Sequence, residues 1–243
     1  GFLTIADFPP KLRAEESVWK QRLQDYADLG FSTVLLTEDD YIILDKDADG
    51  NDIKGELNPT YVMILERLLS SGLDVWVRNY NNQDDYFTSK ELTTNFQKYG
   101  KVTGFYMSDE PFTNETLATK WNQPGVSMDS YTGLIAWKNE YYPDDFWHIN
   151  LVPSSSYNHW DNGSEGVNGG YGDYIQYYID NVIKKLEGGG RTVCLDCYPL
   201  RENGAGIYKD YLFDLMTGAN KTRDYNKTAS VGNKATYGTC IQA

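Results

Sequence analysis

Short hydrophobic runs alternate along the chain with segments whose hydrophobic positions recur at helical spacing. The runs have the length and the β-branched and aromatic content of strands, while a period of about 3.6 residues is typical of helices that bury one face. Because each run precedes a helical segment, the pattern predicts an α/β fold with a parallel sheet. The predicted strands are residues 1–8, 31–36, 74–80, 102–110, 146–152, 192–198 and 237–243, and the predicted helices are residues 15–29, 59–71, 89–99, 130–142, 173–187 and 207–216.

The repetition of strand and helix favours a (β/α)8 TIM-type barrel over an open doubly wound sheet. Seven strand–helix steps follow one another, strand first, each of about 30 residues, as in such a barrel. No glycine-rich phosphate loop follows the first strand, so the signature of a dinucleotide-binding fold is missing. We expect a single barrel domain over residues 1–243 that is incomplete or truncated after strand seven.

The charge of the chain excludes several classes of partner. The sequence has 35 Asp and Glu against 22 Lys and Arg, for a formal net charge of −13 at pH 7. Nucleic acid and anionic membrane surfaces bind basic patches, so we expect neither as a partner. The hydrophobic runs are far shorter than the roughly 20 residues of a membrane-spanning helix, so we expect no membrane insertion.

Polar and aromatic residues share one face of the predicted sheet. On four predicted strands, hydrophobic residues take every second position and would face the helices. The positions between them would point into the barrel and toward the carboxyl ends of the strands, where barrel enzymes place their sites. Burying so many polar atoms without a use is unfavourable, which favours a functional site over a solvated barrel mouth without chemistry. The inward residues are Trp76, Arg78, Tyr80, Gly104, Tyr106, Ser108, Glu110, His148, Asn150, Cys194, Asp196 and Tyr198.

Glu110 is the strongest candidate for a catalytic acid or base. It ends a predicted strand, follows Asp109 and directly precedes Pro111. An aromatic environment raises the pKa of a carboxyl group, which suits a general acid. The alternative is a polar strand exit without a catalytic role.

Glycoside hydrolysis usually needs a second carboxylate, about 5–5.5 Å away for retention of configuration or about 6.5–9.5 Å away for inversion. Asp196 is the first candidate for this second carboxylate, because it takes one of the strand positions predicted to point inward. Its alternative role is to bind a substrate hydroxyl. Other carboxylates at strand ends are Asp7, Glu38 and Asp39.

Residues 104–111, GFYMSDEP, resemble the fourth strand of (β/α)8 glycoside hydrolases of the clan that includes β-galactosidases and many endoglycanases. In that clan an Asn-Glu-Pro or Asp-Glu-Pro motif supplies the acid/base glutamate, which maps onto Glu110. The resemblance covers the whole chain in pattern and implies a glycosidase acting on a poly- or oligosaccharide. The clan's nucleophile glutamate ends strand seven, where this chain has Gln242. This departure leaves open a barrel of the same kind that binds carbohydrate at a surface without hydrolysing it.

A sugar ligand suits the aromatic content of the chain, which is 14% Phe, Trp and Tyr. Pyranose rings stack on flat aromatic side chains, while amides, carboxylates and imidazoles bind hydroxyls. A carbohydrate is therefore the expected partner, and no cofactor is expected. The predicted substrate-binding residues are Arg78, Tyr80, Asp109, His148, Asn150, Tyr198 and Trp160.

Residues 45–56 match the pattern of an EF-hand calcium loop. However, Asp52 takes a position where an apolar residue normally packs, and Gly50 with the preceding aspartate favours a hairpin turn. We prefer a turn with a solvated acidic rim, and calcium binding is the alternative. The calcium ligands would be Asp45, Asp47, Asp49 and Glu56.

The chain also carries Asn-x-Ser/Thr sequons, which accept glycans in exported proteins. We expect an extracellular or cell-surface location. The sequons begin at Asn114, Asn162, Asn220 and Asn226.

Overall fold

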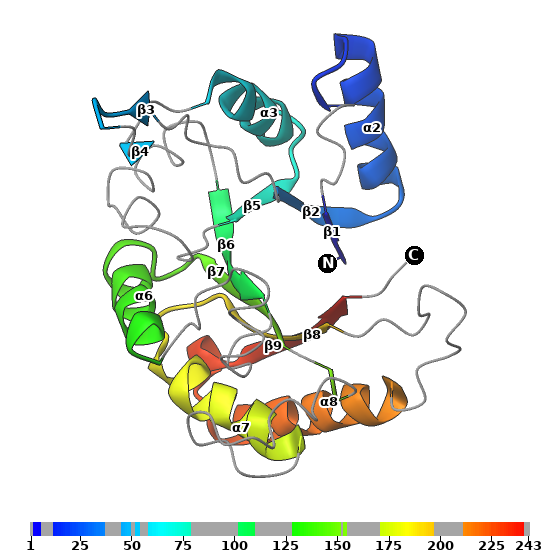
Figure 1. The fold of residues 1–243 in the computed structure, drawn as a ribbon. Helices are drawn as coiled ribbons and strands as arrows, with labels where there is room; N and C mark the ends of the chain where they lie inside the picture. Colours follow the sequence, from blue (N-terminus) through cyan, green and yellow to red (C-terminus); the bar gives the residue numbers. More distant parts are fainter. Residues whose placement is uncertain are drawn as a thin grey trace. The chain divides into compact units, whose positions relative to one another are not determined.

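A computed structural model places the described part of the chain in an α/β fold (Figure 1). The described residues are 2–5, 12–36, 45–49, 52–53, 58–78, 102–109, 128–151, 153–154, 171–196 and 211–240. The chain divides into two compact units, one formed by Gly1–Asn79 with Asp84–Tyr106 and the other by Tyr80–Gln83 with Met107–Ala243. The expectation of a single domain stays a prediction.

Parallel strands that follow one another in chain order form the sheet of the first unit. These strands are β1 (Phe2–Ile5), β2 (Phe31–Leu36), β5 (Asp74–Arg78) and β6 (Val102–Asp109), of which β6 continues into the second unit from Met107 onward. In the register of the sheet, Val34 lies beside Val75, and Val77 lies beside Phe105. Parallel strands with helices between them confirm the predicted α/β class.

The described helices of the first unit begin and end close to their predicted bounds. They are α2 (Glu16–Asp28) and α3 (Pro59–Leu69). The predicted helix 89–99 lies outside the described residues. Asn58 caps α3, since its side-chain oxygen accepts a hydrogen bond from the backbone N of Thr60 at 2.9 Å. Pro59 suits the first turn, where a backbone N–H has no partner within the helix. A local capping signal thus sets this helix start.

The segment with the calcium-loop pattern forms an antiparallel hairpin. Its strands are β3 (Asp45–Lys46) and β4 (Asp52–Ile53). Asp45 lies beside Ile53 in the register. Between the strands, the side chain of Asp47 accepts a hydrogen bond from the backbone N of Asp49 at 2.9 Å, as short polar side chains do in turns. The hairpin interpretation of this segment is therefore confirmed.

The second unit repeats the order of strand and helix. Its strands include β7 (Phe146–Leu151), β8 (Arg191–Asp196) and β9 (Ala235–Cys240), and β8 pairs in parallel with both of the others. Its helices are α6 (Met128–Tyr141), α7 (Tyr171–Asn181) and α8 (Tyr211–Thr228), with short 3-10 turns η2 (Ile183–Lys185) and η4 (Val231–Asn233).

Helix α8 lies very close to β8 and β9. A Cβ atom on Gly218 would lie 2.6 Å from Cε2 of Tyr237 and 2.8 Å from Cδ1 of Leu195. A larger residue at position 218 would require the side chains of Tyr237 and Leu195 to shift, because real Cβ atoms do not approach this closely. The hydroxyl of Tyr237 also donates to the carbonyl of Leu215 at 2.9 Å. Leu195 and Tyr237 therefore mark the face of the sheet that α8 covers.

Two buried cations hold the glycine turn that precedes β8. The Lys138 ammonium donates to the carbonyls of Glu187 at 3.0 Å and Gly189 at 3.3 Å, and the Arg191 guanidinium donates to the carbonyl of Gly188. Both side chains are buried. Burial and, to a lesser extent, the positive charge of Arg191 together lower the pKa of Lys138 to about 8. Backbone carbonyls thus replace the water that these cations lose.

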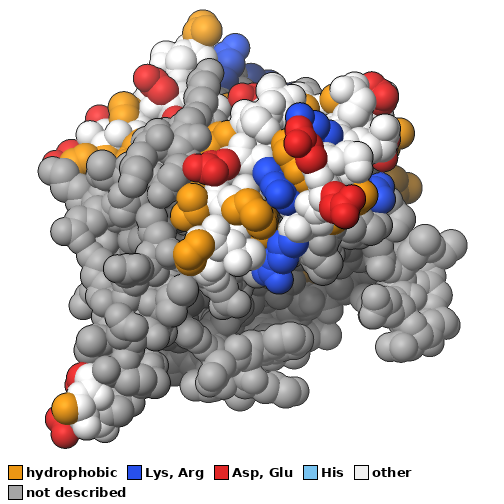
Figure 2. Space-filling model, turned by 90° about the horizontal axis from the view of Figure 1, so that it is seen from above, with side chains coloured by type: hydrophobic (Ala, Val, Ile, Leu, Met, Phe, Trp, Pro, Cys, Tyr) orange, Lys and Arg blue, Asp and Glu red, His pale blue; other side chains and the backbone are white. Residues whose placement is uncertain are grey.

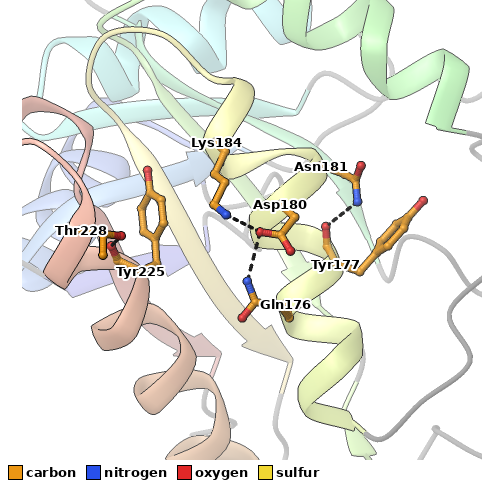
Figure 3. Close-up of polar contacts among 7 residues, drawn as sticks. All are labelled: Gln176, Tyr177, Asp180, Asn181, Lys184, Tyr225 and Thr228. Carbon is orange, nitrogen blue, oxygen red and sulfur yellow. Dashed lines mark hydrogen bonds and ion pairs between the residues drawn. The ribbon is translucent and has the colours of Figure 1, made fainter.

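Two helix ends differ from the predictions by more than a few residues. The predicted helix 173–187 is interrupted, because α7 ends at Asn181 and η2 follows it. Figure 3 shows Asp180 accepting from Gln176 at 3.1 Å and pairing with Lys184 at 2.6 Å, so side chains one turn apart bridge this interruption. The predicted helix 207–216 is too short, because α8 runs to Thr228.

Candidate functional site

The register of the first unit separates two faces of its sheet, as strand alternation predicts. Leu36, Val77 and Phe105 form one row across β2, β5 and β6, and all three side chains are fully buried. The neighbouring row contains Trp76 and Gly104, and Trp76 keeps 8% of its surface exposed. The hydrophobic positions and the predicted inward positions thus lie on opposite faces of the sheet.

The same alternation holds on β7 and β8. Positions of one parity have no exposed surface, namely Trp147, Ile149, Leu151, Val193 and Leu195. At the positions between them, His148, Asn150 and Cys194 keep 3%, 8% and 5% of their surface exposed. Leu195 faces α8, so the second set lies on the opposite face, which we call the inner face. His148 and Asn150 therefore lie on the face where the sequence predicts the site.

One row of the inner face crosses β7, β8 and β9. Asn150 lies beside Cys194, and Cys194 lies beside Gly238. A Cβ atom on Gly238 would lie 3.8 Å from the Sγ of Cys194, which places these two positions on the same face. This row therefore presents an amide, a thiol and a position without a side chain, in that order.

Three predicted site residues end strands. Arg78 ends β5, Asp109 ends β6 and Asp196 ends β8, and Glu110 directly follows Asp109. The side chains of these strand-end residues lie outside the described part of the chain, as do Glu110, Tyr80, Tyr198 and Trp160 altogether. Of the predicted site residues, the structure places the side chains of His148 and Asn150.

Asp214 is a buried acid that the sequence patterns do not single out. Its side chain, in the first turn of α8, is fully buried and accepts a hydrogen bond from the backbone N of Ser154 at 2.9 Å. Ser154 follows β7, so this contact joins the loop after β7 to the start of α8. An acidic residue in the first turn of a helix is a signal that sequence analysis can detect, but its burial depends on packing.

Metal binding has no support among the described side chains. Within the described ranges, no group of three or more His, Cys, Asp or Glu side chains is placed to hold a metal ion. For the calcium alternative, Asp49 is exposed, while the side chain of Asp45 and all of Glu56 lie outside those ranges. Calcium binding therefore stays an untested alternative.

The described surface shows mixed charge. In Figure 2, Lys and Arg side chains lie beside Asp and Glu and beside hydrophobic side chains on the face drawn. Polyanions bind basic patches of a single sign, and these interspersed charges do not form one there. Among the described helices, none combines the length and hydrophobicity that a membrane crossing requires.

Comparisons with known proteins give matches among solved structures. No protein-family model matches the chain, and no curated protein matches its sequence. A monomeric beta-xylosidase from Caulobacter crescentus CB15 aligns with a TM-score of 0.52 and 13% identity over 92% of this chain and 49% of the other. The chain shares the fold of this structure.

Two further structures align less closely. The GH39 enzyme from Xanthomonas axonopodis pv. citri gives a TM-score of 0.49 and 12% identity over 92% of this chain and 48% of the other. SuiB from Streptococcus suis, bound to S-adenosylmethionine, gives a TM-score of 0.44 and 15% identity over 91% of this chain and 41% of the other. The chain thus spans about half the length of the two glycosidase-type structures.

At this identity the likeness shows the fold alone. It supports a glycoside hydrolase-like α/β fold, and the parallel strands are consistent with part of a TIM-type barrel. The resemblance of residues 104–111 to a glycoside hydrolase clan stays a prediction.

Proposed function

We propose that this chain is a glycoside hydrolase-like domain that cleaves a glycosidic bond in a poly- or oligosaccharide by carboxylate acid/base catalysis. Glu110 is the acid/base, and Asp196 is the second carboxylate or a group that binds a substrate hydroxyl. The observation that carries the proposal is the polar inner face, where His148 and Asn150 interrupt the otherwise hydrophobic strand β7. Polar groups on a buried face near strand ends suit a ligand rich in hydroxyls.

The strand ends support the same proposal. Alternation would place Asp196 on the face of Cys194, two residues further along β8. Glu110 follows the last residue of β6, and barrel enzymes take their catalytic groups from such positions. The similar fold of a beta-xylosidase agrees with this reaction class. The remaining residues proposed to line the sugar site are Arg78, Tyr80, Asp109, Tyr198 and Trp160.

Glu110→Gln tests the assignment. The amide cannot transfer a proton, so kcat/KM for aryl β-glycosides should fall by about 10²- to 10⁴-fold. The loss should be larger for a poor leaving group, such as methylumbelliferone, than for 2,4-dinitrophenol, because the better leaving group needs less protonation. Sugar binding measured by calorimetry should persist.

Glu66→Gln is the matched control, because Glu66 is an exposed glutamate of α3. This control should keep wild-type turnover. Unchanged turnover of Glu110→Gln would refute the assignment of Glu110.

A second candidate function is a barrel that binds carbohydrate without hydrolysing it. It is favoured by Gln242, which stands where the clan that residues 104–111 resemble has its nucleophile glutamate. Binding on a glycan array without release of reducing sugar would favour this function over the glycosidase. In either case we propose an extracellular or cell-surface location, where polysaccharides are accessible.

A further inference from the structure

The inner face is open over β9 and closed over β8. Thr192 of β8 keeps 6% exposure, whereas its register partner Thr236 on β9 is exposed. One row further along, Cys194 keeps 5%, whereas its partner Gly238 is partly exposed. Solvent therefore reaches the inner face at β9, next to the row that contains Asn150.

Among the described residues, neither the backbone nor the packing requires a glycine at position 238. Its φ lies outside the left-handed region, and within the described part of the chain a Cβ atom there would meet the Sγ of Cys194 alone, at an ordinary contact distance of 3.8 Å. At Gly218, by contrast, a Cβ atom would overlap side-chain atoms of Tyr237 and Leu195 at 2.6 and 2.8 Å, which would have to shift. Glycine is disfavoured within strands unless a bulge or a close approach calls for it. The register between β8 and β9 shows no shift over residues 191–196, so no bulge accounts for this glycine, and we attribute it to the close approach of a ligand.

The row of Asn150, Cys194 and Gly238 has the dimensions and chemistry of a sugar subsite. Two strand spacings of about 4.8 Å separate its outer positions, a span that a pyranose ring with one exocyclic group fills. The Asn150 amide can both donate to and accept from hydroxyls, and the Cys194 thiol forms a small hydrophobic floor. No side chain in this row carries a formal charge, and the net charge of −13 disfavours acidic sugars.

We propose that the space at Gly238 receives the exocyclic hydroxymethyl group of a neutral hexopyranose, so that Gly238 sets a preference for hexosides over pentosides. This inference rests on the proposed function and names the substrate class of the same site. A pentopyranose lacks the hydroxymethyl group and would leave the space empty. A side chain at position 238 would occupy this space and remove the preference.

The test compares variants of the 243-residue chain on 4-nitrophenyl β-D-glucoside, β-D-mannoside, β-D-galactoside and β-D-xyloside. Wild-type protein should prefer one of the hexosides to the xyloside. Gly238→Val should lower the ratio of hexoside to xyloside kcat/KM by about 10- to 200-fold, the range that small steric differences in a pocket produce. Gly238→Ala should shift the ratio in the same direction by less, and it covers the case in which the valine variant fails to fold.

Gly232→Val is the matched control. Gly232 is an exposed glycine whose φ is not left-handed and whose Cβ would meet nothing within 4 Å. This variant should keep the wild-type ratio, and all variants should keep melting temperatures close to that of wild type. The ratio separates a subsite from a structural effect, because a damaged fold lowers activity on all four substrates together.

The outcomes separate this inference from the proposed function. If wild-type protein neither hydrolyses these glycosides nor binds the matching methyl glycosides in calorimetry, the proposed function fails and the subsite fails with it. If the chain binds without hydrolysis, the ratio of dissociation constants replaces the ratio of rates. If wild-type protein acts on or binds sugars but substitution at position 238 leaves the hexoside-to-pentoside ratio unchanged, the subsite alone is overturned.

Discussion

Asn226 of α8 makes two reciprocal hydrogen bonds with the backbone of Ala235, the first residue of β9. Its Nδ2 donates to the carbonyl of Ala235, and its Oδ1 accepts from the backbone N, each at 2.8 Å. The side-chain amide therefore satisfies both polar groups of one residue, as a neighbouring strand would. The same asparagine begins a sequon, so a glycan on its Nδ2 would compete with this contact.

Asn226→Ala should lower the free energy of unfolding by about 1–3 kcal/mol, because it leaves the two backbone groups of Ala235 without their partner. Asn226→Asp should have a smaller effect, since the carboxylate still accepts from the backbone N. Urea denaturation monitored by circular dichroism measures both changes. Asn220→Ala is the control, because Asn220 is an exposed sequon asparagine of the same helix, and it should change stability by less than about 0.5 kcal/mol.

Lys138 should make stability depend on pH above neutrality. Its folded-state pKa is about 8, below the ordinary value of 10.5, so the unfolded chain binds more protons between these two values. The free energy of unfolding attributable to Lys138 should therefore rise as the pH increases through this window and stay constant below it.

Denaturation of wild type and Lys138→Met from pH 7 to pH 10.5 measures this effect as the difference between the two proteins. Lys185→Met, at an exposed lysine of η2, controls for the loss of a positive charge. A difference between wild type and Lys138→Met that falls with rising pH would contradict the prediction.

Two neighbouring glycines before β8, Gly189 and Gly190, should differ in how much substitution by alanine lowers stability. Gly190 has a φ of 75°, and its Cβ would lie 2.4 Å from the carbonyl oxygen of Asp145, whereas a Cβ on Gly189 would lie 3.8 Å from its nearest neighbour. Gly190→Ala should lower the free energy of unfolding by about 2 kcal/mol or more, through strain and steric overlap. Gly189→Ala is the matched control and should be tolerated. Equal melting temperatures for the two variants would count against this account of the turn.

Asp214 should hold the start of the loop after β7. Asp214→Ala removes the acceptor for the backbone N of Ser154, so we expect a loss of about 1–3 kcal/mol in stability and faster hydrogen exchange at the Ser154 amide. Asp214→Asn keeps a side-chain oxygen and should retain most of the protection. Asp173→Ala, at an exposed acid in the first turn of α7, is the control for the helix-end charge. Wild-type exchange at Ser154 in Asp214→Ala would contradict this role.

Hydrophobic periodicity predicted the strands better than the helix ends. The strand 31–36 was predicted with its observed bounds, and the predicted alternation on β7 and β8 matches their burial. The second half of α8 was missed because it is polar, and contacts such as that of Asn226 with Ala235 stabilise it. The end of α7 was missed because Arg191, later in the chain, binds the carbonyls of Ile183 and Leu186.

The sequence by itself determined the order of strands and helices, the α/β class and the division of each strand into two faces. Hydrophobic residues recur at the period of the helix or strand that buries them, so neighbouring residues are enough to reveal these features. The neighbours across strands were decided only by the tertiary structure. The register that aligns Asn150 with Cys194 and Gly238 and the packing that buries Lys138 and Asp214 join residues far apart in the chain. A local pattern records that a position is buried, but it does not record which distant atoms bury it.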